Sequence, residues 1–320
     1  MPRWSRVAAA LVGLLVGAAL LAYAFHGTPP TAVWAVLRDG RWGFPAMVVL
    51  AGTALFVYAK SARWRLLLGT EPALPVWPLA RSVLAGLALN ACVPHSGEFI
   101  RAFSLERLFG RAATRVLSSI VAERVFDLFG VLILGSAALV YVRVSAELAA
   151  AFRLLAVVAA VLAALVILAL AAPAAIRTIV ASCTSRFPRT VAAWIAKRTD
   201  EALAGLEPVR SPAISARVLA WSLAQWLAVA LAVHGCAAVV GFEPGAAAAM
   251  LVVVGIVVAF LLPNAPGYAG SVQVAFLVTL KPLGIADELA LGASIVYQLL
   301  MVLPLIVGGL AFLRPSLAKP

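Results

Sequence analysis

Residues 83–110 read "VLAGLALNACVPHSGEFIRAFSLERLFG", an apolar run followed by a polar break. Pro94 lacks a backbone donor and restricts Val93, while Gly97 permits unusual backbone angles, so the helix is expected to unwind there. A second interruption, "LLPNAPGYAGSVQ" at 261–273, follows another apolar run near the C-terminus. Each break predicts a helical segment that enters the apolar part of the protein and turns back.

The composition is that of a membrane protein. Hydrophobic residues make up 64% of the chain and charged residues 12%, whereas soluble domains carry roughly 45–50% and 25%. Several stretches reach the ~20 apolar residues needed to cross a bilayer. The sequence therefore predicts an all-α polytopic membrane protein with a single transmembrane domain over 1–320, and no separate soluble catalytic domain is expected.

Hydropathy predicts about six spanning helices plus two re-entrant helical hairpins. The hairpins are expected at 76–112 and 245–283, because the apolar segment before each break is only about 18 residues long, short for a span. Two thin spans in place of each hairpin would give the same topology. The first span could also pass for a signal peptide, but its apolar run is long for one. The spans are expected at 7–25, 44–68, 116–142, 150–172, 215–240 and 288–312.

The placement of lysine and arginine predicts the orientation. With the N-terminus inside, 19 of the 25 Lys and Arg residues fall on the cytoplasmic side, five fall outside and Arg124 lies within a span. The cytoplasmic group includes Lys60, Arg63 and Arg101. This bias predicts a multi-pass protein of the cytoplasmic (inner) membrane with both termini in the cytoplasm. Basic loops facing anionic lipid account for the net charge of +12, so no nucleic-acid partner is expected.

The two halves of the chain resemble each other at a nearly constant offset. "GTEP" at 69–72 recurs as "GFEP" at 241–244, and "SSIV" at 118–121 recurs as "ASIV" at 293–296, which sets Glu123 opposite Gln298. On the predicted topology the copies are inverted, an arrangement that points to a transport site near the bilayer midplane. The segments are a first span with its outer loop (1–43), repeat 1 (44–142), a connecting span with a cytoplasmic interfacial loop (143–213) and repeat 2 (214–314).

Two further patterns concern the membrane surface. Residues 188–206 predict a helix with Trp194 on an apolar face, which is typical either of an interfacial helix or of a cytoplasmic linker. Four tryptophans are expected to be interfacial anchors: Trp34, Trp42, Trp64 and Trp77.

The charged residues near the first break need partners if they lie in the membrane. Glu98 and Arg101 are spaced to pair at i,i+3, and so are Arg124 and Asp127. Glu123 would then need a donor from elsewhere, such as Arg101 or Asn90, because each charge at the bilayer centre costs about 2.5–3.5 kcal/mol. Either the charges join the spans or lie at the cytoplasmic end, or they serve a substrate or gate.

These residues carry a resemblance to a known family. The spacing of Asn90, Pro94, Gly97–Glu98 and Arg101, followed by "ERVFD" at 123–127, resembles the first signature of the flippase-like family typified by the transmembrane region of lysylphosphatidylglycerol synthase. "PGYAGSVQ" at 266–273 resembles a degraded second signature in which Gln273 replaces the usual acid. The candidate substrate-binding residues are Asn90, Pro94, Gly97, Glu98, Arg101, Glu123, Arg124, Asp127, Pro263, Asn264, Pro266, Gly267, Gly270 and Gln273.

The resemblance implies a non-enzymatic flippase or scramblase that moves a polar or phosphate-bearing lipid between leaflets. A lipid-synthesis or glycosyltransferase enzyme is a possible partner, and no cofactor or metal is expected, since the sequence contains no nucleotide-binding motif. Two alternatives stay open: a secondary transporter of a small solute or ion, and a non-transporting accessory subunit of a lipid-modifying or glycosyltransferase pathway. If the usual acid carries protons, its replacement by Gln273 predicts weak pH dependence or a transfer of that task to Glu98 or Glu123.

Overall fold

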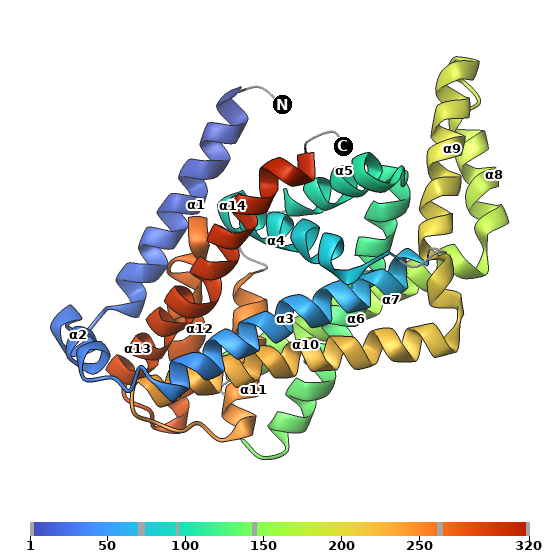
Figure 1. Ribbon diagram of the computed structural model, residues 1–320. Coiled ribbons are helices and arrows are strands. Elements are labelled where there is room, and N and C mark those ends of the chain that lie inside the picture. The colour runs from blue at the N-terminus through green and yellow to red at the C-terminus, as the bar shows by residue number, and fades with distance from the viewer. Residues whose placement is uncertain (1–2, 70–73, 94–95, 143–145, 261–264, 318–320) are drawn as a thin grey trace.

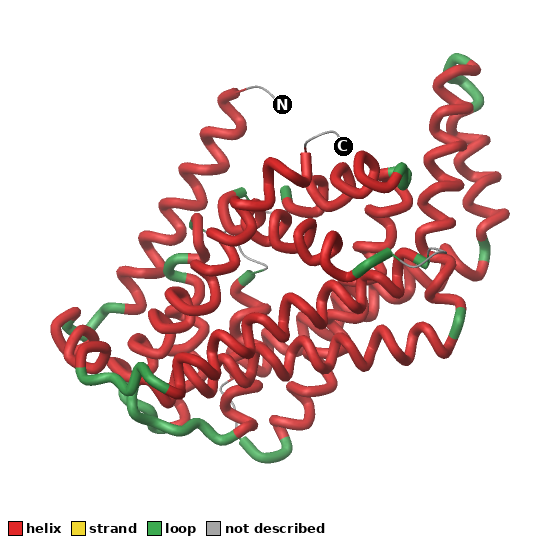
Figure 2. Tube along the Cα trace, viewed as in Figure 1, coloured by secondary structure: helices red, strands yellow, loops and turns green. Residues whose placement is uncertain are grey.

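The computed structural model describes residues 3–69, 74–93, 96–142, 146–260 and 265–317, and in these ranges the chain is helical apart from short turns (Figures 1 and 2). Pro94, Pro263 and Asn264 therefore lie outside the described residues. The helices are α1 (Arg3–Ala24), α2 (Pro30–Arg38), α3 (Phe44–Leu68), α4 (Val76–Cys92), α5 (Gly97–Phe109), α6 (Ala113–Leu139), α7 (Ala146–Ala171), α8 (Pro173–Thr184), α9 (Arg189–Leu206), α10 (Pro212–Val239), α11 (Ala246–Ala259), α12 (Ser271–Leu280), α13 (Asp287–Tyr297) and α14 (Leu303–Leu317).

A helix lies at every predicted span, and the all-helical prediction is confirmed. Within the described ranges, four helices are long and apolar enough to cross a membrane: α3, α10, residues 148–171 of α7, and the continuous stretch Asp287–Leu313. The last of these joins α13 to α14 through one π-helical turn, Gln298–Val302. α6 has 27 residues, but the charges Glu123, Arg124 and Asp127 near its middle keep it out of this group.

α3 and α10 lie side by side and antiparallel along most of their lengths (Figure 1). Glycines allow this close approach: a Cβ on Gly52 would lie 2.8 Å from the carbonyl oxygen of Ala228, and one on Gly235 would lie 2.9 Å from Val49. Small residues at such contacts are how membrane helices pack closely. This pair forms a central support to which the shorter helices attach.

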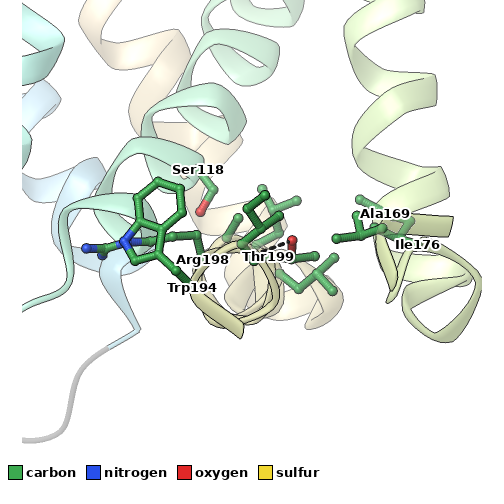
Figure 3. Close-up of a pocket in the computed structure, with 11 residues that line it drawn as sticks. Ser118, Ala169, Ile176, Trp194, Arg198 and Thr199 are labelled. Carbon is green, nitrogen blue, oxygen red and sulfur yellow. Dashed lines mark hydrogen bonds between the residues drawn. The ribbon is translucent and has the colours of Figure 1, made fainter. Parts of the chain in front are cut away.

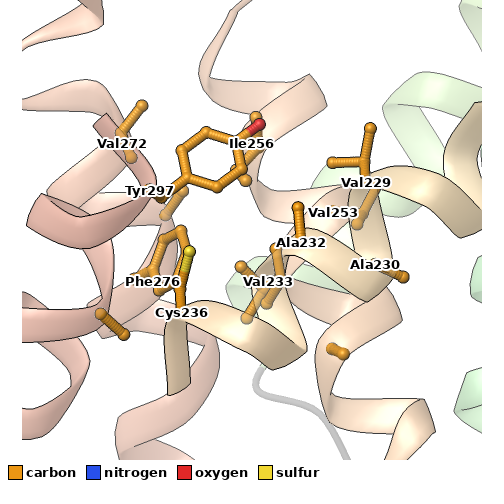
Figure 4. Packing of buried hydrophobic residues seen from close by; sticks show 14 of the residues in the cluster. Val229, Ala230, Ala232, Val233, Cys236, Val253, Ile256, Val272, Phe276 and Tyr297 are labelled. Atoms are coloured by element: carbon orange, nitrogen blue, oxygen red, sulfur yellow. The ribbon is translucent and has the colours of Figure 1, made fainter. Parts of the chain in front are cut away.

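The larger hydrophobic core surrounds α11. Its sequence "AAAAMLVVVGIVVA" is apolar on every side, as expected for a helix covered by protein all round, and Val252, Val253 and Val254 are fully buried. Figure 4 shows Val253 of α11 among side chains of α10, Phe276 of α12 and Tyr297 of α13. A second core lies between α3, α4, α5 and α6 around Trp64.

Each half of the chain follows the same order: a long helix, a pair of short helices, and another long helix. In the first half these are α3, α4 with α5, and α6; in the second they are α10, α11 with α12, and α13 continuing into α14. α4 packs on α5, and α11 packs on α12. The two short pairs therefore stand at corresponding places, each joined across one of the polar breaks.

α8 and α9 form a hairpin whose far end projects beyond the other helices (Figure 1), while the C-terminal part of α9 packs on α6. The N-terminal end of α1 and the C-terminal end of α14 point to the side on which the hairpin projects (Figure 1). α9 is the helix predicted at 188–206, and its Trp194 is 59% exposed.

Candidate functional site

The first break is held by Asn90. α4 ends at Cys92 and α5 begins at Gly97, and the Asn90 Oδ1 accepts a hydrogen bond from the Gly97 N–H at 2.7 Å. The amide of Asn90 also donates to Glu98 at 3.4 Å. The first N–H groups of a helix have no partner within the helix. Asn90 therefore supplies such a partner from α4 and fixes where α5 begins.

Glycines let α4 and α5 touch at this break. A Cβ on Gly97 would collide with the backbone carbonyl of Gly86, and one on Gly86 would lie 2.9 Å from the Arg101 side chain. The colliding atoms at Gly97 belong to the backbone, so a side-chain rotation cannot relieve the contact. The break therefore requires glycine at 97 for packing.

We expect Gly97→Ala to destabilise the protein by about 1–3 kcal/mol, the usual cost of overpacking a well-packed site. Thermal unfolding in detergent measures this. Gly308→Ala is the matched control, since it lies within α14 with open space around its Cα and alanine favours helix. Equal unfolding temperatures for the two variants would contradict the close contact.

The second break is held by neutral amides. Residues Pro266–Tyr268 form one tight turn, in which Gly267 (φ +71°) and Tyr268 (φ +59°) are left-handed, and Gly270 (φ +83°) precedes α12. The Gln273 Oε1 accepts from the Gly270 N–H at 2.8 Å, and its Nε2 donates to the Gln298 Oε1 at 2.6 Å. The Gln298 Nε2 in turn donates to the Gly267 carbonyl at 3.1 Å. This chain of bonds ties both sides of the turn to α13, at the start of its π-helical turn.

Five buried charged residues form a cluster beneath the first break: Lys60 and Arg63 of α3, Arg101 of α5, and Glu123 and Asp127 of α6. Arg101 binds Glu123 with both Nη atoms, at 2.6 and 3.3 Å. Arg63 lies 2.6 Å from Asp127 and 3.0 Å from Glu123. Lys60 contacts Glu123 closely and lies 3.7 Å from Asp127. Of the two donors expected for Glu123, Arg101 is confirmed, whereas Asn90 donates to Glu98 instead.

Polar and aromatic side chains complete the walls of this ionic cluster. On α10, Gln225 donates to Asp127 at 2.9 Å and Ser222 accepts from Arg63 at 2.9 Å. The Arg101 guanidinium lies 4.0 Å from the centre of the Trp64 ring, within cation–π range. The cluster thus joins α3, α5, α6 and α10 through bonds that would each be costly to break in an apolar interior.

One assignment made from the sequence, that of Trp64, is wrong here. Lys60 and Arg63, counted among the cytoplasmic cations from the sequence, are buried in the cluster at 5% and 0% exposure, so they pair with acids of α6 and are not surface charges. Trp64 was expected at the membrane interface, but it is fully buried under Arg101, whereas Trp34 and Trp77 are exposed. The sequence did contain one indication of this cluster: Glu123 and Asp127 in α6 need donors, and other helices could supply them.

The cluster contains three cations and two acids, so it carries one surplus positive charge. The neighbouring pair Arg124–Glu98 is neutral and leaves this surplus unchanged. Buried charge without a counter-charge is expensive. The region is therefore suited to attract an anion.

Arg124 pairs with Glu98 of α5 rather than with Asp127, and Glu98 therefore does not pair with Arg101 as the spacing predicted. The Arg124 side chain is 45% exposed and that of Glu98 16%. Arg124 is thus the accessible cation of the region, in contrast to Arg101, which is 4% exposed.

The Arg124–Glu98 pair lies where the two breaks meet. α4 contacts the turn Pro266–Tyr268, and the Tyr268 side chain lies within electrostatic range of Arg124, Glu98 and Cys92. Residues of the first and second candidate signatures therefore lie together at one partly open polar site. In the sequence they are more than 140 positions apart. We call this the elbow site, defined by Glu98, Arg124 and Tyr268.

A family model for the transmembrane region of lysylphosphatidylglycerol synthase matches residues 10–309. The chain belongs to this family. No curated protein and no solved structure matches it. Membership of the lysylphosphatidylglycerol synthase transmembrane-region family indicates a membrane protein tied to lipid modification or transport.

Proposed function

We propose that the protein moves a phosphate-bearing lipid between the leaflets of the membrane, with the headgroup passing through the elbow site. The observation that carries this proposal is the partly exposed Arg124–Glu98 pair at the meeting point of two helix breaks. Exposed apolar side chains surround it on the same helices, including Phe99, Val121 and Phe129. A charged headgroup and two acyl chains need such a mixed surface.

Arg124 is the residue suited to hold the phosphate. A guanidinium presents a fork of donors that binds two phosphate oxygens at once. Arg101 has the same chemistry, but Glu123 already occupies both of its Nη atoms and the side chain is buried. The surplus positive charge of the buried ionic cluster adds to the attraction of Arg124 for the phosphate. Glu98 holds Arg124 when no lipid is bound and can take a cationic group of a headgroup when one is.

The arrangement of the helices supports a mechanism in which the headgroup site opens alternately to the two sides of the membrane. The repeated order of long helix, short pair and long helix, with α3 and α10 antiparallel, is what an inverted repeat produces. In the proposal, α4–α5 and α11–α12 are re-entrant pairs that enter from opposite sides. Irregular backbone is tolerated at membrane depth only where it is covered by protein or lines a wet cavity, and broken segments of this kind form the sites of known transporter folds.

The proposal assigns transport and no catalytic chemistry to these residues, and it places both termini in the cytoplasm. Movement would be passive or driven by an ion gradient. A leaflet-resolved assay with fluorescent phosphatidylglycerol in proteoliposomes, with and without a pH gradient, tests it. Accelerated exchange between leaflets is the expected result. Uptake of small solutes without lipid movement would favour a solute carrier, and no movement at all would favour an accessory subunit.

We expect Gln273→Glu to destabilise the protein at the second break, and to lower its unfolding temperature more at pH 8 than at pH 5. The new carboxylate would lose the donor that faces Gln298, and burying it is cheaper when it carries a proton. The wild-type protein has no titratable group at this position, so its unfolding temperature should change less over the same range. Thermal unfolding at both pH values measures the effect, with Gln298→Asn as a neutral variant of the same bond.

If the Gln273→Glu protein instead keeps its stability at pH 8 and its transport becomes pH-dependent, the new carboxyl group at position 273 carries a proton during the transport cycle. Unchanged stability together with an unchanged pH profile would contradict the hydrogen-bond role that the structure assigns to Gln273.

A further inference from the structure

A cavity lies beside the α8–α9 hairpin. Its volume is about 400 Å³, and most of its lining is apolar. Figure 3 shows Trp194, Arg198, Thr199 and Ser118 on one side of it and Ala169 and Ile176 on the other. We call this space the hairpin groove.

The hairpin groove has two walls of different origin. One wall is α6 with α9, which pack tightly: a Cβ on Gly205 would collide with the backbone of Arg115, and Arg198 donates to Thr114 at 3.4 Å. The other wall is the end of α7 with the start of α8, represented by Ala169 and Ile176. The groove is therefore a gap between two pairs of helices and is open on one side.

The apolar lining of the groove continues onto the outer surface of α7. α7 is the most apolar of the four spanning candidates and only 17% of its span is buried inside the protein. Its exposed side chains include Leu154, Val161, Leu165 and Leu168. In a bilayer this surface is covered by acyl chains, so a chain can slide from α7 into the groove without crossing water.

The hairpin and its connections are basic, and Arg198 lines the groove itself. Between 173 and 217 the chain has seven Lys and Arg residues against three acids. Arg198 pairs with Glu201 and Arg177 with Asp200, which leaves a basic excess on the hairpin. The Arg198 guanidinium also lies 5.6 Å from the Trp194 ring, a combination of amphipathic side chains that suits the bilayer interface.

From this continuity and charge we propose that the hairpin groove binds one acyl chain of an anionic phospholipid, whose phosphate lies near Lys197 and Arg198. Such a lipid would anchor the α8–α9 hairpin to the membrane surface. This site is separate from the elbow site, and its occupancy does not depend on whether the protein moves lipid.

The test uses purified protein in nanodiscs of phosphatidylcholine with a minor fraction of a photoactivatable phosphatidylglycerol or phosphatidylcholine. We expect phosphatidylglycerol to label peptides of α8 and α9 about fivefold more than phosphatidylcholine, the preference expected of one basic residue near an anionic surface. Ala202→Trp, which fills the groove, should abolish this labelling. Ala193→Trp is the control, since Ala193 is exposed on α9 and does not line the groove.

Equal labelling by the two lipids, or labelling that survives in Ala202→Trp, would overturn the proposal. If Ala202→Trp fails to fold, Arg198→Gln decides: loss of the phosphatidylglycerol preference supports the site, and an unchanged preference overturns it. Labelling blocked by a second copy of the chain, seen as a dimer in the nanodisc, would mean that the groove is a protein interface and would also overturn it. Transport in proteoliposomes, measured in parallel, reports on the elbow site alone.

Discussion

Replacing Glu123 by glutamine should destabilise the protein by about 3–5 kcal/mol, the cost of breaking a buried ion pair by removing one partner. Glu123 is fully buried and contacts Lys60, Arg63 and Arg101. Its loss would leave three cations facing only Asp127. For a chain of this size the unfolding temperature should fall by roughly 5–7 °C, as measured by thermal unfolding in detergent.

Glu243→Gln is the matched control for this change. Glu243 is exposed in the turn before α11, and neutralising a surface acid usually changes stability by less than about 0.5 kcal/mol. If Glu123→Gln and Glu243→Gln unfold at the same temperature, the ionic cluster does not hold the helices together.

Replacing Arg124 by glutamine should reduce lipid movement by about 10- to 100-fold, the effect of losing a hydrogen bond to a charged group worth roughly 1.5–3 kcal/mol. Stability should change little, because the Arg124 side chain is 45% exposed and its partner Glu98 keeps Asn90 as a donor. Arg124→Lys should be intermediate, since lysine keeps the charge but binds phosphate only as a point charge. The leaflet-resolved assay measures all three proteins.

Arg189→Gln serves as the control for Arg124→Gln, because Arg189 is an exposed arginine at the start of α9. Arg101 provides a contrast: Arg101→Gln should lose folded protein, since it removes the bidentate partner of Glu123. A folded Arg124→Gln protein that moves lipid at the wild-type rate would show that the headgroup passes elsewhere.

Much of the fold could be predicted from the sequence, because spans and breaks are local properties. Long apolar runs have few alternatives to a membrane helix, and the helices at 44–68 and 76–92 begin where hydropathy placed them. The donor to Glu123 could also be anticipated, since an unpaired acid in an apolar setting is too costly to leave alone.

The other partners in the ionic cluster could not be predicted, because they depend on how helices pack. Lys60 and Arg63 follow an apolar run, and a reading along the chain assigns such cations to the membrane surface. Only the contact of α3 with α6 shows that they face Glu123 and Asp127. The pairing of Arg124 with Glu98 was missed for the same reason: spacing within one helix predicted local pairs, whereas the structure forms them between helices.

The most direct test of the elbow site uses the cysteines that the chain already has. Cys92 is exposed beside the first break, Cys183 is exposed on the α8–α9 hairpin, and Cys236 is buried in the core. In proteoliposomes, a water-soluble maleimide should label Cys92 and Cys183 but not Cys236, and a short-chain phosphatidylglycerol should slow labelling of Cys92. Labelling of Cys92 only after the membrane is dissolved in detergent would place it against lipid and contradict a wet headgroup path at the elbow site.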